Sequence, residues 1–229
     1  MIVRRLAATR GHTTISWLDS WHSFSFGGYH DPAFGKFGAL RVINEDRVAP
    51  GAGFGEHGHA DMEILSYVVS GALGHRDSLG NGATIAAGDI QRMTAGTGVR
   101  HAEMNASSTE TVHFFQIWLE PAQLGLAPGY EQVTLPQPVP GGLTRLAGRD
   151  RNDGGVVIHQ GATLYRATPG AGMPVCVPFA PGRRACLQVV RGDICANDVG
   201  LTAGDGAAVT GEAMLHLAGD GEALIIDLA

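Results

Sequence analysis

The sequence predicts an all-β fold assembled from many short strands. Glycine supplies 34 of the 229 residues, about twice its average usage, and charged residues make up only 17%. Segments 64–70 and 112–119 are rich in β-branched and aromatic residues, which is typical of strands. Helical periodicity is scarce along the chain. Short strands joined by glycine turns account for this composition.

A segment of the first half recurs in the second half. Tyr67–Gly71 resembles Gln188–Gly192, and the tripeptide Ala-Gly-Asp occurs at both 87–89 and 203–205. In each copy an apolar strand ends at a glycine, and the Ala-Gly-Asp turn begins the return strand. Two copies of one β-module are therefore predicted.

The two modules suggest two domains. A segment rich in proline and glycine, residues 127–154, has the composition of a linker. We therefore expect an N-terminal domain over residues 1–130 and a C-terminal domain over residues 131–229.

Two residue pairs with a spacing of two predict a metal site in the first half. They are His57 with His59, and His101 with Glu103, and a glycine-rich stretch precedes each pair. Side chains at positions i and i+2 of a strand point to the same face, so each pair can aim two metal-binding groups at one point. Three imidazoles and one carboxylate leave coordination positions open, as in a catalytic or ligand-binding centre.

The second half lacks a comparable set. Counting from the repeated strand, Pro178 and Ala180 take the places of the first histidine pair. Counting from the repeated turn, His216 falls within one residue of the place of His101. One ligand does not hold a metal, so the C-terminal domain is predicted to have none. His216 is expected to be a hydrogen-bonded core histidine.

The composition argues against several classes of protein. The net charge is −6 and basic residues cluster only in pairs, which disfavours direct binding to nucleic acid. The N-terminal segment lacks the apolar stretch of a secretory signal, and no run approaches the roughly 18 apolar residues of a membrane span. The three cysteines, Cys176, Cys186 and Cys195, are expected to be reduced thiols of a cytoplasmic protein.

The metal motifs resemble those of the cupin superfamily. The first reads Gly51-x5-His57-x-His59-x3-Glu63, and the second reads Gly98-x2-His101-x3-Asn105. The chain departs from the usual cupin pattern at Gly71, one residue late, and at Gly96, which stands in the region of an expected proline. These departures point to one branch of the superfamily.

That branch is the pirin family, which the chain resembles along nearly its full length. The pirin-like blocks are residues 21–26, 29–32, 40–44, 57–63, 96–103 and 116–118. The resemblance implies two tandem cupin barrels of jelly-roll type, with the metal in the N-terminal barrel and a degenerate C-terminal barrel without metal. The duplication argues independently for the same organisation.

Two glutamates compete for the fourth ligand position. Glu63 shares strand parity with His57 and His59, as in the ordinary cupin pattern. Pirins instead use the glutamate two residues after the third histidine, which corresponds to Glu103. The resemblance therefore favours Glu103, and Glu63 is expected to orient one of the imidazoles of the site.

The resemblance also implies an activity. Some pirins are similar in function to quercetin 2,3-dioxygenases, which cleave flavonols with O2 and release carbon monoxide. Glu103 would then accept the proton of the flavonol 3-hydroxyl. We expect one divalent transition metal, Fe(II) first, with Cu, Ni, Co, Mn or Zn as alternatives. Side chains expected to line a flavonol pocket are Phe24, Phe26, Phe54, Met62 and Met104.

The alternative is a non-enzymatic, metal- or redox-responsive regulator that acts through a protein partner, because animal pirins resemble transcriptional coregulators. Turnover separates the two hypotheses, since a dioxygenase consumes O2 in proportion to flavonol. A cupin isomerase or sugar-binding barrel would need polar pocket residues, and the sequence does not identify any.

Overall fold

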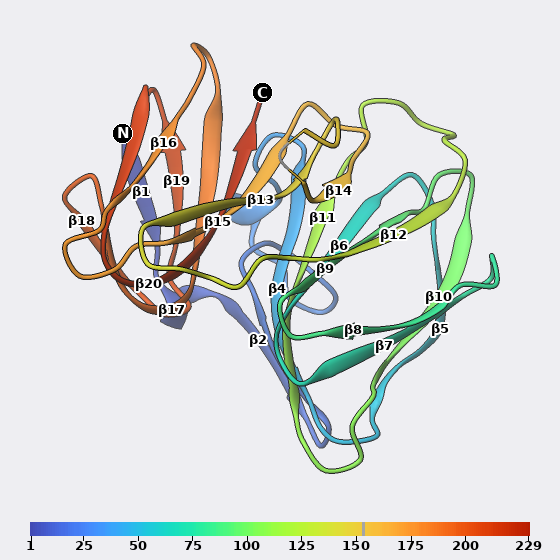
Figure 1. Ribbon diagram of the computed structural model, residues 1–229. Coiled ribbons are helices and arrows are strands. Elements are labelled where there is room, and N and C mark those ends of the chain that lie inside the picture. The colour runs from blue at the N-terminus through green and yellow to red at the C-terminus, as the bar shows by residue number, and fades with distance from the viewer. Residues whose placement is uncertain (153) are drawn as a thin grey trace. The chain divides into compact units, whose positions relative to one another are not determined.

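The computed structural model describes residues 1–152 and 154–229 and consists almost entirely of strands (Figure 1). It divides into two compact units, each built from separate stretches of chain. Unit 1 comprises Met1–Arg10, Pro136–Gly154 and Gly161–Ala229, and unit 2 comprises Gly11–Leu135 and Gly155–Gln160. These ranges differ from the single boundary expected after residue 130. No helix in the described ranges is long and apolar enough to span a membrane.

Unit 2 contains two antiparallel sheets. The larger one runs in the order β12 (Gly129–Thr134), β9 (Asp89–Thr94), β6 (Glu63–Ser70), β11 (Val112–Leu119), β4 (Leu40–Val48), β3 (Leu18–His22) and β2 (Gly11–Ile15). The smaller one runs in the order β5 (Gly53–His59), β10 (Val99–Asn105), β7 (Ala72–Asp77) and β8 (Gly82–Ala86). The unit also includes the 3₁₀ helix η2 (Pro32–Phe34) and the short strand β14 (Val156–Val157).

Apolar side chains from both sheets of unit 2 form a common core. Val48 and Phe114 come from the larger sheet, and Leu73 and Ile85 come from the smaller one; all four are fully buried. The two sheets therefore pack face to face, as in a jelly roll.

Unit 1 is built around two long strands, β17 (Arg184–Ala196) and β20 (Met214–Leu228). The main sheet order is β1 (Ile2–Arg5), β19 (Gly206–Thr210), β17, β20, β15 (Thr163–Thr168) and β13 (Gly142–Gly148), with β16 (Val175–Pro178) on β20 and β18 (Val199–Thr202) on β17. The 3₁₀ helix η1 (Ala7–Thr9) follows β1. Because β1 pairs with β19, the first residues of the chain belong to unit 1.

The backbone confirms the internal duplication. Gly88 and Gly204, the glycines of the two Ala-Gly-Asp turns, both have φ of 86°. The N–H of Gly88 donates to the carbonyl of Val68, and that of Gly204 donates to the carbonyl of Val189, at 3.0 Å in each case. Equivalent turns thus follow equivalent strands in the two units.

The same register corrects the expectation for His216. His101 lies twelve residues after the aspartate of its Ala-Gly-Asp turn, and that spacing in unit 1 leads to the buried Leu217. His216 points to the opposite, exposed face, where its Nδ1 lies 3.2 Å from Sγ of Cys176. A slip of one residue moves a strand side chain to the other face. His216 is therefore not a core histidine, and it does not occupy the ligand position.

Apolar residues fill the corresponding place in unit 1. Val175 pairs with Leu217 as His57 pairs with His101, and Val177 follows two residues later. All three apolar side chains are at most 2% exposed and belong to one core cluster. These positions lie three residues before those expected from the sequence, because the connection to the next repeated strand is longer in unit 1.

The three cysteines are free. Cys176 and Cys195 are exposed, whereas Cys186 is buried, and this burial raises the pKa of its thiol to about 12. The Cys186 thiol is therefore protonated and inert at neutral pH.

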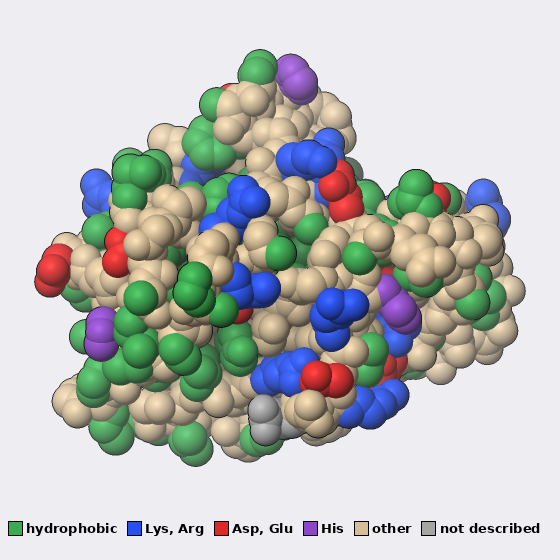
Figure 2. Space-filling model, turned by 90° about the horizontal axis from the view of Figure 1, so that it is seen from above, with side chains coloured by type: hydrophobic (Ala, Val, Ile, Leu, Met, Phe, Trp, Pro, Cys, Tyr) green, Lys and Arg blue, Asp and Glu red, His purple; other side chains and the backbone are tan. Residues whose placement is uncertain are grey.

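Many basic side chains are ion-paired, and acidic side chains lie beside several of them on the face shown in Figure 2. The pairs include Lys36–Glu120, Arg47–Glu45, Arg92–Glu131, Arg100–Glu56, Arg145–Asp150, Arg183–Asp227 and Arg191–Glu222.

Candidate metal centre

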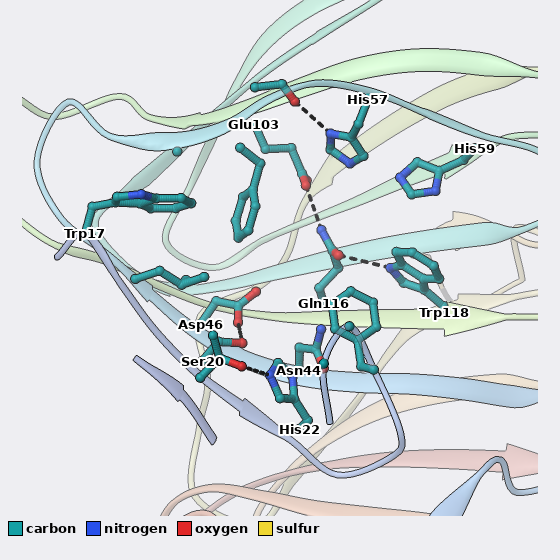
Figure 3. Close-up of a pocket in the computed structure, with 18 residues that line it drawn as sticks. Trp17, Ser20, His22, Asn44, Asp46, His57, His59, Glu103, Gln116 and Trp118 are labelled. Carbon is teal, nitrogen blue, oxygen red and sulfur yellow. Dashed lines mark hydrogen bonds between the residues drawn. The ribbon is translucent and has the colours of Figure 1, made fainter. Parts of the chain in front are cut away.

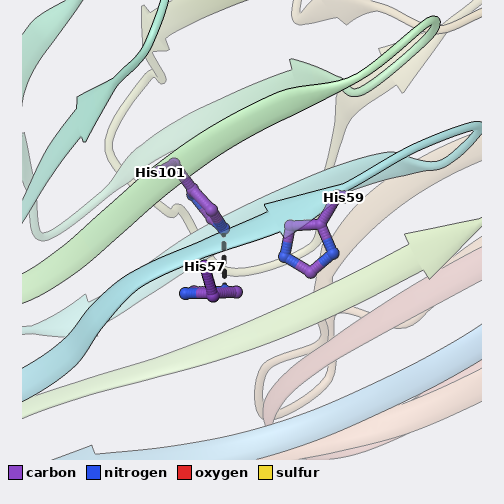
Figure 4. Close-up of side chains that lie close together, drawn as sticks. All are labelled: His57, His59 and His101. Carbon is purple, nitrogen blue, oxygen red and sulfur yellow. Dashed lines mark hydrogen bonds between the residues drawn. The ribbon is translucent and has the colours of Figure 1, made fainter.

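His57, His59 and His101 converge where β5 pairs with β10 (Figure 4). His57 lies directly opposite His101 in the antiparallel pair, and His59 follows on the same face. The three ring centroids are 4.5 to 4.9 Å apart, and one nitrogen of each ring lies within 4.8 Å of the others. The structure therefore brings together the three histidines of the predicted site.

Hydrogen bonding leaves ring nitrogens available to a cation. Nδ1 of His57 donates to the carbonyl oxygen of Gly55 at 2.8 Å, which places a free lone pair on Nε2. This Nε2 lies 3.1 Å from Nε2 of His101. Two nitrogens bound side by side to one metal at ~2.1 Å would be about 3 Å apart. Among the described residues, Nε2 of His59 is buried without a hydrogen-bond partner. This donor set fits a divalent transition metal.

The electrostatics keep the imidazoles of His59 and His101 neutral. Burial, followed by repulsion from His57, lowers the pKa of His59 to about 4. Burial and the neighbouring histidines lower the pKa of His101 to about 3. Since the neutral imidazole is the form that binds a metal, neither ring has to release a proton at neutral pH.

Glu103 lies beside this trio and is deeply buried. Its Oε2 accepts a 2.7 Å hydrogen bond from Gln116, and its Oε1 accepts a longer one, 3.4 Å, from Ser66. Burial raises the pKa of the Glu103 carboxyl, and the Gln116 hydrogen bond opposes this effect only in part. In the described residues Glu103 groups with His75 and His101 within 4.8 Å, as a second set that shares His101 with the first.

His75 is a site residue that the motif analysis did not identify. It is buried on β7, and its Nε2 lies 3.1 Å from a carboxylate oxygen of Asp77. Its ring centroid lies 5.5 Å from that of His101 and 4.8 Å from that of Tyr130. His75 and Asp77 have the same spacing of two residues as the two predicted pairs. Side chains at this spacing share one face of a strand, so the sequence pattern could have identified them as a third pair.

Glu63 occupies a different place from the one expected. It lies on β6 in the larger sheet, is fully buried, and accepts a hydrogen bond of 3.1 Å from Nδ1 of His159. Glu63 thus orients an imidazole, but not one of the three converging rings. Asp61 at the adjacent turn accepts a hydrogen bond from the N–H of Gly125 at 2.7 Å.

A pocket of about 470 Å³ opens beside His57, His59 and Glu103 (Figure 3). Its aromatic walls are Trp17 with Phe54, which meet edge to face at 5.3 Å, and Phe26 with Trp118, which meet edge to face at 5.4 Å.

Two of the five expected wall residues, Phe26 and Phe54, line this pocket. Phe24 is buried but does not line it, and Met62 packs against the core around Ile64. Met104 is 40% exposed, because it alternates with the buried Glu103 along β10. The expectation was wrong for these three residues, and Trp17 and Trp118 were not among the expected wall residues.

A family model for pirins matches residues 3–119. The chain belongs to the pirin family. A second model, described as the quercetinase C-terminal cupin domain, matches residues 145–228 of this pirin.

Relatives and solved structures match over the whole chain. A protein named quercetin 2,3-dioxygenase from Escherichia coli strain K12 is 44% identical over 230 residues, which cover 100% of this chain and 99% of that protein. A pirin-like protein from Caulobacter vibrioides is 38% identical over 233 residues, which cover 100% of this chain and 100% of that protein.

The crystal structure of YhhW from Escherichia coli has a TM-score of 0.95 and 43% identity, covering 100% of this chain and 98% of that one. A structure of the same bacterial pirin in complex with nickel(II) has a TM-score of 0.94 and 43% identity, with 100% and 99% covered. The two cupin domains predicted for this pirin are thereby confirmed.

A glycine on β5 makes room for the site. The chain register shifts between His101 and Glu103, and a Cβ atom on Gly53 would lie 2.2 Å from the carbonyl oxygen of Glu103.

We expect Gly53→Ala to cost about 1–3 kcal/mol of unfolding free energy by overpacking and to weaken metal binding. Gly55→Ala on the same strand is the control, because its Cβ would meet nothing within 4 Å. Urea unfolding of both variants checks this, and equal losses would contradict it.

Proposed function

We propose that this pirin is a metal-dependent dioxygenase that cleaves flavonols such as quercetin, consuming O2 and releasing carbon monoxide. The observation that carries the proposal is the convergence of His57, His59 and His101 beside an aromatic-walled pocket of about 470 Å³. Pockets of this size hold small organic ligands. The names of the Escherichia coli and other bacterial relatives support a flavonol as the substrate.

The three histidines would hold the metal, with Glu103 as the fourth ligand. A bound divalent cation supplies Lewis acidity, which favours the deprotonated form of a hydroxyl that binds it. We propose Fe(II), but a set of imidazoles also suits nickel, and the Escherichia coli pirin binds nickel(II) in a solved structure.

Glu103 is proposed to accept the proton of the flavonol 3-hydroxyl. Because burial raises its pKa, the carboxylate is a stronger base than an exposed glutamate. Gln116 donates to Oε2 of Glu103, and the indole N–H of Trp118 donates to Oε1 of Gln116 at 3.0 Å. This chain of hydrogen bonds holds the carboxylate toward the pocket (Figure 3).

The aromatic walls act on the rest of the substrate. Trp17, Phe26, Phe54 and Trp118 can enclose a flat ring system and exclude water from it. A flavonol so enclosed, with its 3-hydroxyl at Glu103, would present its central ring to O2. The bonds from carbon 3 to carbons 2 and 4 would break, the two oxygen atoms of O2 would enter the organic product at carbons 2 and 4, and carbon 3 would leave with its own oxygen as carbon monoxide. The proton held by Glu103 would return to the carboxylate of the product.

The test measures O2 consumption and the loss of flavonol absorbance when quercetin is added to protein loaded separately with Fe(II), Ni(II), Cu(II) or Co(II). We expect one O2 consumed per flavonol with at least one metal, and turnover should vanish in His101→Ala. Full metal occupancy without turnover under every loading would contradict the proposal and favour a regulator that acts through a protein partner.

A further inference from the structure

The pocket wall opposite the converging histidines carries a polar cluster that the proposed chemistry does not use. It consists of Ser20 and His22 from β3 and Asn44 and Asp46 from β4, all lining the pocket (Figure 3). Each residue is at most 3% exposed. They occupy the inward face of their strands, which carries the core residue Val48 two positions after Asp46. The sequence alone did not identify these polar residues as pocket-lining.

Backbone register pairs the four residues two by two. Ser20 lies directly opposite Asp46, and its hydroxyl donates to Oδ1 of that carboxylate. His22 lies opposite Asn44, and its Nδ1 donates to the amide Oδ1 at 2.9 Å. Nε2 of His22 then accepts from the hydroxyl of Thr13 at 3.0 Å. Among the described residues, these side-chain hydrogen bonds involve Oδ1 of Asp46 and Oδ1 of Asn44. They do not involve Oδ2 of Asp46 or the side-chain N–H₂ of Asn44, and both groups line the pocket.

Such a cluster is costly in the core of a barrel unless it serves a ligand. Burial of a carboxylate disfavours its charged form, and it raises the pKa of Asp46 to about 7 in spite of the Ser20 hydrogen bond; repulsion from Glu103, Glu45 and Asp19 adds to the increase. An apolar side chain such as Val48 would pack at the same face without this cost. Asp46 lines the pocket, so a molecule within the pocket can reach its Oδ2 and form a hydrogen bond with it.

We propose that Asp46 and Asn44 bind a hydroxyl group of the substrate at the end of the pocket away from the metal. A hydroxyl can donate to Oδ2 of Asp46 and accept from the amide of Asn44, so it satisfies both groups at once. The preferred substrate is then a flat aromatic compound with a hydroxyl remote from the oxygens that meet the metal. This inference rests on the proposed function, because it takes the metal-binding end of the substrate as given.

The test compares the binding of two flavonols to nickel-loaded protein without O2, using the fluorescence of the tryptophans. Quercetin carries hydroxyls on both outer rings, whereas 3-hydroxyflavone carries only the hydroxyl next to the carbonyl. We expect the wild type to bind quercetin at least about tenfold more tightly, because a site built for a hydroxyl rejects an analogue that lacks it. Asp46→Asn should reduce this ratio to about threefold or less and leave 3-hydroxyflavone binding unchanged.

Glu45→Gln is the matched control. Glu45 is the preceding residue, is also buried, and points to the opposite face of the sheet, where it contacts Arg47 and His113. This substitution should leave the quercetin preference at its wild-type value. Asp46→Asn keeps the side-chain shape and an oxygen for Ser20, so its metal content should match the wild type. If it does not fold, Asn44→Ala removes the other half of the hydroxyl site and takes the same test.

Two contrary results have different meanings. A wild type that binds both flavonols, with a ratio that Asp46→Asn does not change or that Glu45→Gln reduces equally, would overturn this inference alone. A metal-loaded wild type that binds neither flavonol would overturn the proposed function together with it.

Discussion

His101→Ala is expected to abolish metal binding at the candidate centre. The His101 ring lies opposite His57 and belongs to both groups of potential ligands, so its loss leaves neither group complete. Removing an outer hydrogen-bond partner of a metal ligand costs roughly 10- to 100-fold in affinity, and removing a ligand should cost more. Titration calorimetry with Ni(II), together with elemental analysis after dialysis, measures this effect.

His216→Ala is the control for this prediction. It removes the histidine nearest to the corresponding place in unit 1, but His216 is exposed and its ring contacts Cys176. Metal content should remain at the wild-type value. Full occupancy in His101→Ala, or equal losses in the two variants, would show that the metal binds elsewhere.

Strand parity explains why the candidate site could be predicted from sequence. His57, His59 and His101 lie at spacings that a strand turns into a common face, and a short glycine-rich connection precedes each pair. Local spacing was therefore enough to bring the three imidazoles together once β5 and β10 paired. His75 carries the same parity signal with Asp77, but it lies outside the two motifs.

Long-range register explains what could not be predicted. In unit 1 the position equivalent to His101 is occupied by Leu217 and not by its neighbour His216. A shift of one residue along a strand moves a side chain to the opposite face of the sheet. Similarly, Glu63 has the parity of His57 but lies in the other sheet, where it contacts His159. Parity relates residues within one strand and does not say which sheet that strand joins. The polar residues Ser20, His22, Asn44 and Asp46 were not predicted to line the pocket, because the sequence of a strand does not show what that strand faces across the barrel.

Glu103→Gln is expected to lower the turnover of flavonol by about 10²–10⁴-fold, the range that loss of a general base covers. The amide has the shape of the carboxylate and can still accept from Gln116, so the loss isolates the charge and the basicity. Turnover is measured on protein saturated with metal, which separates an effect on proton transfer from an effect on affinity.

Glu63→Gln provides the matched control, because Glu63 is an equally buried glutamate in the same unit, and it contacts His159 instead of the converging histidines. Its metal content and turnover should stay near the wild-type values. Loss of metal in Glu63→Gln, with full metal and turnover in Glu103→Gln, would reverse the choice between the two carboxylates.

The metal-free forms give an independent readout of the same carboxylate. Since burial raises the pKa of Glu103, the folded protein binds more protons than the unfolded chain once the pH exceeds about 4.3, the pKa of an unperturbed glutamate. The unfolding free energy of the wild type should therefore fall with rising pH relative to that of Glu103→Gln, which cannot titrate there. Urea unfolding of both apoproteins from pH 5 to 8 measures the difference. A difference that stays constant would mean that the carboxylate is as well solvated in the folded protein as in the unfolded chain, and it would remove the basis for treating Glu103 as the strengthened base.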